Sequence, residues 1–260
     1  MRLSRALFAL PTLFTLSSVL MGMISIVSAA EGDFEIGALA ILFAVLFDSL
    51  DGRVARLTRT ESKFGVQIDS LADVVSFGVA PAVLAYLGFL RGRFEFGPLD
   101  LGLAGAFLFL AAGAIRLARY NVDADRKPGP VRTFTGLPIP GGAGCIAGLV
   151  LGLTLEEATL GATTMLGFLL LLSFLMVSTV KYRKKVDVRA PDTLVLLGLL
   201  VLTLLLVAAV RPAFTAFSFF AFYMLSGLAE STLLAVVRVV RRARPSRRVK
   251  SDARGDSDVS

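Results

Sequence analysis

Residues 48–73 read DSLDGRVARLTRTESKFGVQIDSLAD, and this stretch places two pairs of aspartates at the ends of two apolar segments. Asp48 and Asp51 are three residues apart, and Asp69 and Asp73 are four apart, so each pair shares one face of a helix. The polar residues between the pairs are expected to turn the chain back. The two helices would then be antiparallel neighbours with their acidic faces opposed, and four carboxylates would converge.

The chain around this stretch is unusually apolar. Hydrophobic residues make up 55% of it and the mean hydropathy is +0.76, which is well above the range of soluble domains. We therefore expect an all-α integral membrane protein, a polytopic bundle of about eight transmembrane helices. The apolar stretches that predict these spans are residues 12–30, 35–56, 66–90, 101–119, 139–153, 158–180, 192–210 and 213–237.

The placement of the basic residues predicts the orientation of the spans. If the N-terminus is cytoplasmic, all but three of the 27 Lys and Arg residues fall on the cytoplasmic side, the exceptions being Arg91, Arg93 and Arg211. This is the positive-inside pattern, and it predicts that both termini are cytoplasmic. The net charge of +7 is then explained by topology and by anionic lipid, without nucleic acid as a partner. We expect residues 1–240 to form the transmembrane domain and residues 241–260 a basic, disordered cytoplasmic tail.

The first span also has the features of a secretory signal peptide. Arg2 and Arg5 precede the apolar run, and residues 27–29 could form a small-residue cleavage site. The apolar run of residues 6–30 is long for a signal peptide, so we expect it to stay as a transmembrane helix.

The residue types present restrict the chemistry. The chain has no His, which excludes a histidine base, a histidine metal ligand and a Ser-His-Asp triad, and its single Cys145 lies in an apolar, small-residue stretch typical of buried packing. Four carboxylates in a membrane protein would repel one another unless cations neutralise them. Oxygen ligands favour the hard cations Mg²⁺ and Mn²⁺, and four acids suffice for two ions.

From Asp48 to Asp73 the chain fits the pattern D-x2-D-G-x2-A-R-x8-G-x3-D-x3-D at every fixed position, and it therefore resembles the CDP-alcohol phosphotransferase family. The resemblance implies two metal ions, one held by Asp48, Asp51 and Asp69 and the other near Asp69 and Asp73. It implies that Asp73 is the general base, which takes the proton of an acceptor hydroxyl that attacks the β-phosphorus of a CDP-lipid and releases CMP. The residues that it implies for binding the CDP group are Gly52, Ala55, Arg56, Ser62 and Gly65.

Sequence around and beyond the motif resembles the phosphatidylserine synthase branch of this family, at residues 64–65, 71–81, 116–121, 134–138, 176–178 and 181–182. This implies transfer of a phosphatidyl group from CDP-diacylglycerol to the hydroxyl of L-serine, which gives phosphatidylserine. A serine zwitterion needs a cation for its carboxylate, and an arginine can bind a carboxylate through two hydrogen bonds. The candidates for binding the acceptor or a phosphate are Arg116, Arg119, Tyr120, Asn121 and Lys181.

Other functions stay open at this point. The same residues would serve another acceptor, such as glycerol 3-phosphate or inositol phosphate, or an ether-lipid donor, and the arginines could simply mark the inner membrane edge. A divalent-cation transporter is a remote alternative, since transporters often show inverted repeats and acids near the membrane midplane, and neither is visible here. The resemblance also implies a homodimer. The aspartates lie at the ends of the spans that the basic residues place in the cytoplasm, so we expect an active site that faces the cytoplasm, in a bacterial-type inner membrane.

Overall fold

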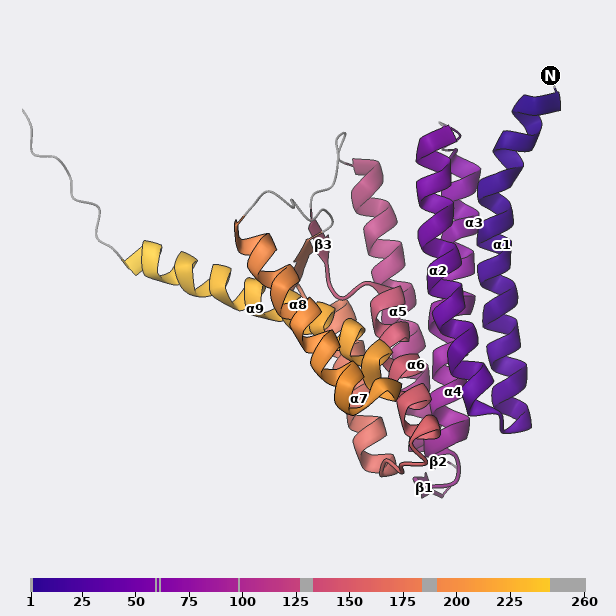
Figure 1. The fold of residues 1–260 in the computed structure, drawn as a ribbon, viewed down its shortest axis with the longest axis vertical. Helices are drawn as coiled ribbons and strands as arrows, with labels where there is room; N and C mark the ends of the chain where they lie inside the picture. Colours follow the sequence, from indigo (N-terminus) through magenta and orange to yellow (C-terminus); the bar gives the residue numbers. More distant parts are fainter. Residues whose placement is uncertain are drawn as a thin grey trace, which may run out of the picture.

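The computed structural model describes residues 2–58, 60, 62–97, 99–126, 133–183 and 191–243, and these are mostly helical (Figure 1). The helices α1 to α5 stand roughly parallel, whereas α8 and α9 are inclined to them. In chain order the elements are α1 (Arg2–Glu31), α2 (Phe34–Thr58), α3 (Lys63–Asp73), η1 (Val74–Val79), α4 (Ala80–Ala85), η2 (Tyr86–Leu90), β1 (Glu95–Phe96), β2 (Leu99–Asp100), α5 (Leu101–Arg126), β3 (Thr133–Thr135), α6 (Ile139–Leu155), α7 (Ala162–Val177), β4 (Lys181–Arg183), α8 (Pro191–Val210), η3 (Pro212–Phe214) and α9 (Thr215–Ala243).

Each of the eight predicted spans coincides with a helical segment. Four helices in the described part of the chain are long and apolar enough to cross a membrane by themselves, at Leu10–Glu31, Lys63–Leu90, Leu101–Asp123 and Pro212–Ala229. Three further apolar helices are shorter, and α2 has a full membrane-spanning length but carries the charged motif over its last turns. The fold is thus of the all-α membrane type that the apolar runs predict.

The third predicted span is a composite of α3, η1, α4 and η2, which follow one another without a break. The stretch η1 is π-helical, and the N–H of Ala80 donates to the carbonyl of Val75. Pro81 follows at once and has no N–H to return to the carbonyl four residues earlier, which favours a local departure from α-helical geometry. The departure begins at Val74, directly after Asp73, and π-helical turns of this kind are common next to functional sites.

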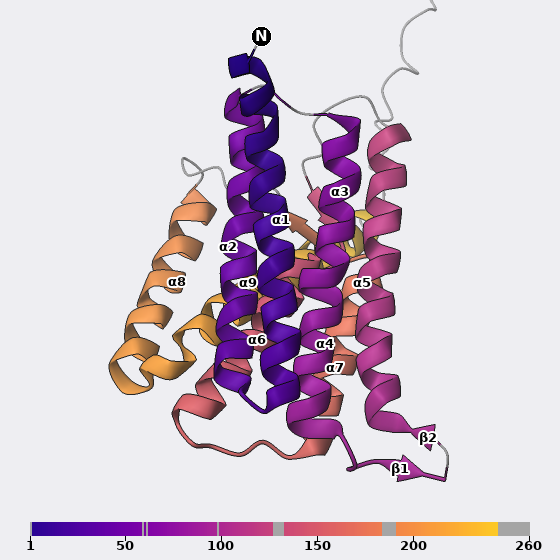
Figure 2. The same cartoon turned by 90° about the vertical axis from the view of Figure 1, so that its right-hand side faces the viewer.

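The helix α1 packs along the length of α2 and also lies against α3 (Figure 2). The α1–α2 turn uses Gly32, whose φ of 87° suits glycine, and the carboxylate of Asp33 accepts the N–H of Ile36 at 3.0 Å in the first turn of α2. On its other side α1 approaches η1 closely, because a Cβ atom at Gly22 would lie 2.8 Å from Cα of Ser76. The first helix is therefore an integral part of the bundle.

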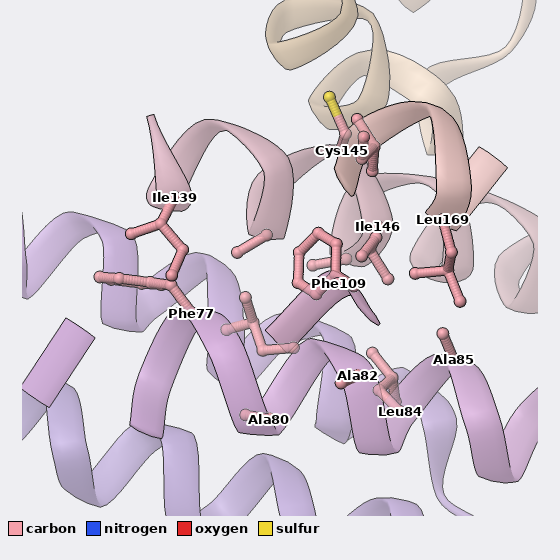
Figure 3. Close-up of a cluster of buried hydrophobic side chains, with 14 of the residues drawn as sticks. Phe77, Ala80, Ala82, Leu84, Ala85, Phe109, Ile139, Cys145, Ile146 and Leu169 are labelled. Carbon is pink, nitrogen blue, oxygen red and sulfur yellow. The ribbon is translucent and has the colours of Figure 1, made fainter. Parts of the chain in front are cut away.

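The helix α6 lies at the centre of the bundle, packed against α2 on one side and α9 on another. It is apolar all round and almost entirely buried, as expected of a helix with no solvent-facing side. Figure 3 shows its Ile139, Cys145 and Ile146 in a cluster with Phe77 and Phe109. The burial of Cys145 confirms the packing role predicted for it.

Glycines on α6 allow α9 to come close. A Cβ atom at Gly148 would lie 2.5 Å from the backbone nitrogen of Phe217, and one at Gly144 would lie 2.4 Å from the ring of Phe220. These glycines are four residues apart and share one face of α6. Any larger side chain at Gly148 must push the α9 backbone away.

Strands β3 and β4 form an antiparallel pair in which Phe134 pairs with Tyr182, and β3 leads the chain into α6. At the end of β3 the residue Gly136 has a φ of 81°, and a Cβ atom there would lie 2.1 Å from the carbonyl oxygen of Met176. Its N–H donates to the carbonyl of Val180 at 2.7 Å. The close approach and the hydrogen bond hold the connection between β3 and α6 against the end of α7.

At the opposite end of the bundle, β1 and β2 form a short hairpin before α5 (Figure 1). The carboxylate of Asp100 accepts a hydrogen bond from the hydroxyl of Tyr86 at 2.7 Å and from the N–H groups of Gly102 and Leu103, so it caps α5. At the C-terminal end α9 runs to Ala243, so the first three residues of the predicted tail are helical, and residues 244–260 lie outside the described residues.

Candidate active site

The aspartates of the motif converge between α2 and α3. Asp48 and Asp51 come from the last turns of α2 and Asp69 from α3, and each offers a carboxylate oxygen within 4.8 Å of those of the other two. Asp51 is 6% exposed and the other two are partly buried. The spacing of the sequence predicts this convergence. The sequence predicted only α2 and α3 as neighbours here, and the structure adds α1, which packs against both of them.

Asp73 completes the cluster from the end of α3. Its carboxyl group lies close to that of Asp48, and the two interact electrostatically. Its Oδ1 atom is buried and has no hydrogen-bond partner among the described residues. Two ionised carboxylates this close repel each other, and a buried acceptor left unpaired costs about 1–3 kcal/mol. A divalent cation would neutralise this repulsion and supply a partner for the buried oxygen, so these four carboxylates fit a metal centre.

One further residue reaches this cluster from α1. The hydroxyl of Thr15 donates to Oδ2 of Asp51 at 2.8 Å, and Thr15 is itself 5% exposed. Sequence analysis missed this contact. Thr15 is one of six Ser and Thr residues in the span of residues 12–30, and the sequence does not distinguish a hydroxyl that contacts another helix from one that bonds within its own helix.

The residues predicted to bind the CDP group lie at the α2–α3 connection, beside the carboxylates. Ser62 is the N-cap of α3 and accepts the N–H of Gly65 at 3.0 Å. A Cβ atom at Gly52 would lie 4.0 Å from both terminal nitrogens of Arg56, so this guanidinium folds back along α2 toward Gly52. Ala55 is half-buried on the same stretch of α2. Gly52 has no side chain and leaves room for a ligand beside the backbone, and the positive charge of Arg56 can pair with a diphosphate group.

Arg116 lies on the α5 side of the cluster and is 5% exposed. It interacts electrostatically with Asp73, and also with Tyr120 and Tyr223. Tyr120 follows it by one turn of α5, whereas Tyr223 comes from α9. The sequence indicated no role for α9, and the structure brings its single tyrosine to the arginine that interacts with the candidate base.

The structure gives the other predicted acceptor residues different surroundings. Arg119 donates from Nη1 to the carbonyl of Val177 and from Nη2 to that of Thr135, both at 3.1 Å. It therefore links the end of α7 to β3. Asn121 donates from Nδ2 to the hydroxyl of Ser70 at 2.9 Å. The side chain of Lys181 lies outside the described residues. An acceptor-binding role for these three residues stays a prediction.

Comparison with known proteins agrees with the site. Residues 8–224 match the sequence pattern of the family described as CDP-alcohol phosphatidyltransferase. A CDP-diacylglycerol–serine O-phosphatidyltransferase from Helicobacter pylori is 40% identical over 205 residues, which cover 77% of this chain and 83% of that protein. An archaetidylserine synthase from Methanothermobacter thermautotrophicus is 36% identical over 176 residues, 67% of this chain and 69% of that one. With its aspartates converging as the motif requires, the chain belongs to the CDP-alcohol phosphatidyltransferase family.

Proposed function

We propose that this protein is an enzyme that transfers the phosphatidyl group of CDP-diacylglycerol to the hydroxyl of L-serine, giving phosphatidylserine and CMP. The observation that carries the proposal is the convergence of the motif carboxylates in one buried cluster. The choice of serine is supported by relatives named as serine O-phosphatidyltransferases, two of which are 40% identical over 77% of this chain and 83% of their own length.

The metal centre is proposed to hold two ions of Mg²⁺ or Mn²⁺. Asp48, Asp51 and Asp69 would hold one ion, and Asp69 and Asp73 would hold the other. When bound, such ions polarise the β-phosphate and stabilise the charge that develops on the leaving CMP. The chain's own residues supply the binding of both substrates and the transfer of the proton.

Asp73 is proposed to take the proton of the serine hydroxyl. The serine oxygen then forms a bond to the β-phosphorus, the bond from this phosphorus to the bridging oxygen breaks, and CMP leaves with that electron pair. The buried Oδ1 of Asp73, unpaired among the described residues, is an available acceptor for this proton. The neighbouring Arg116 places a positive charge beside the base, where the carboxylate of serine can bind.

The CDP group is proposed to bind where α2 ends and α3 begins. Arg56 would pair with the diphosphate, and Gly52 and Gly65 would let it approach the backbone. Ser62 accepts a hydrogen bond through its Oγ, which leaves its hydroxyl proton available to the ligand, and Ala55 provides a small surface on the same side.

We further propose that the chain crosses the bacterial-type inner membrane eight times with both termini in the cytoplasm, and that the active site faces the cytoplasm. The eight helical segments and the bias of basic residues support this topology. Residues 1–240 would form the transmembrane domain and 241–260 a basic cytoplasmic tail. A homodimer is proposed on the resemblance to the family.

The test is CMP release by the purified protein in detergent with Mg²⁺ or Mn²⁺. Serine, glycerol 3-phosphate, inositol phosphate and no acceptor are compared, each with CDP-diacylglycerol and with an ether-lipid CDP donor. Serine-dependent release that is lost with a chelator supports the proposal. Release only with another alcohol overturns the serine assignment, and no release with any acceptor overturns the enzyme assignment.

A further inference from the structure

The first helix contributes a hydrogen bond to the carboxylate cluster that the motif does not include. Thr15 lies in α1, 36 positions before Asp51, and its hydroxyl donates to Oδ2 of that aspartate at 2.8 Å. Both side chains are almost fully buried, at 5% and 6% exposure. The contact therefore forms in a region of low dielectric, where a hydrogen bond to a carboxylate is strong.

The hydroxyl of Thr15 has a choice of acceptors. A threonine within a helix commonly donates to the carbonyl four residues earlier, and here the carbonyl of Pro11 lies at 3.2 Å. Asp51 is nearer and is the better acceptor if it is ionised. Because a hydroxyl has one proton, the geometry favours the bond between helices over the bond within α1.

We propose that Thr15 is a positioning residue that holds the carboxylate of Asp51 in the orientation that binds a divalent cation. A free carboxylate rotates about its Cβ–Cγ bond, and a hydrogen bond to one oxygen restricts this rotation and fixes the direction of the other. Groups that orient metal ligands in this way typically change metal affinity about 10–100-fold when they are removed. The inference rests on the proposed metal centre and adds α1 to it.

The experiment measures Mn²⁺ binding to the purified full-length protein in detergent, without substrates, by electron paramagnetic resonance of the free ion. Thr15→Val removes the hydroxyl and keeps the shape of the side chain, and Thr15→Ser restores the hydroxyl. Thr203→Val is the matched control, because the hydroxyl of Thr203 in α8 donates to the carbonyl of Leu199 at 2.7 Å, within its own helix. Thermal unfolding of each variant shows whether the fold is kept, and Thr15→Ala is the second variant if the valine variant does not fold.

Thr15→Val is expected to weaken Mn²⁺ binding about 10–100-fold, with Thr15→Ser and Thr203→Val within a few-fold of the unaltered protein. Unchanged affinity in Thr15→Val overturns the inference. So does an equal loss in Thr15→Ser, since packing of the methyl group would then explain it. If the unaltered protein binds Mn²⁺ but releases no CMP, the proposed reaction fails while the binding comparison still decides the role of Thr15. If the unaltered protein binds no Mn²⁺, both fail.

Discussion

The carboxyl groups of Asp48 and Asp73 lie close together and interact electrostatically, although one comes from α2 and the other from the end of α3. They are the first and the last aspartate of the motif, 25 positions apart in the chain. Two ionised carboxylates this close repel each other unless a cation or a proton lies between them. When a cation takes that place, Asp73 is left ionised and able to accept a proton from the substrate.

Asp73→Asn is expected to lower kcat by about 10²–10⁴-fold or more, the contribution usual for a general base, while CDP-lipid binding is largely kept. The amide can donate a hydrogen bond to Asp48, so the fold should persist. Steady-state CMP release and equilibrium binding of the CDP-lipid measure the two effects. Glu31→Gln, an exposed carboxylate at the end of α1, is the control. A near-normal rate in Asp73→Asn would remove Asp73 from the role of base.

Arg119→Ala is expected to act through the fold. The guanidinium bonds to backbone carbonyls of α7 and β3, so its loss leaves these acceptors unpaired and should lower the thermal stability. The KM values for serine and for CDP-lipid should then change together. Thermal unfolding and KM measurements for both substrates test this, and a selective rise in the KM for serine would instead show that Arg119 binds the acceptor.

Gly148→Ala is expected to destabilise the protein by about 1–3 kcal/mol, the usual cost of overpacking. The new Cβ atom would lie 2.5 Å from the backbone nitrogen of Phe217 and 2.7 Å from its Cα, so neither rotamer change nor a flexible side chain can relieve the clash. Gly167→Ala in α7 is the matched control, because nothing lies within 4 Å of its added Cβ. Equal thermal unfolding temperatures for the two variants would argue against the close α6–α9 packing.

The stability of the folded protein should fall at acid pH because of Asp100, which precedes the membrane-spanning part of α5. The hydroxyl of Tyr86 and the N–H groups of Leu103 and Gly102 lower the pKa of Asp100 from its usual 3.8. A carboxyl group whose pKa is lowered by folding stabilises the folded state above its usual pKa, and this is lost as the pH falls through the lowered value.

Tyr86→Phe removes the main cause of this shift, so it should lower the unfolding temperature at neutral pH. The difference from the unaltered protein should close below pH 3.8. Thermal unfolding across a pH series measures it. In an Asp100→Asn background the effect of Tyr86→Phe should lose its pH dependence. If the dependence stays, another group is responsible.

The sequence predicted the eight helical segments well because long apolar runs leave few other conformations in a membrane. It also predicted the convergence of Asp48, Asp51 and Asp69, since helix periodicity determines which side chains share a face. Periodicity does not determine which helices become neighbours. The sequence therefore did not predict that α1 packs against α3, or that Tyr223 of α9 lies beside Arg116. Both contacts depend on packing between segments that are distant in the chain.

The hydrogen-bond partners of Arg119 could not be predicted from the sequence either. An arginine at the cytoplasmic end of a predicted span can bind a substrate, a lipid or the backbone, and its position in the sequence is the same in each case. The structure shows bonds to backbone carbonyls because the end of α7 and the β3 strand come together around Gly136. Likewise, the π-helical geometry after Asp73 arises next to Pro81, and apolar patterning alone predicts a regular helix there.

The position of α1 has a consequence for how the protein is built during synthesis. α1 and α2 are consecutive helices joined by a short turn, and their contacts along their length are local in sequence. Local contacts form early, so the α1–α2 hairpin can assemble before the rest of the chain is inserted. Thr15 and Asp51 would then already be paired when α3 arrives with Asp69 and Asp73. A chain cleaved after its first segment would lose α1, and with it the Thr15 hydroxyl that contacts the carboxylate cluster.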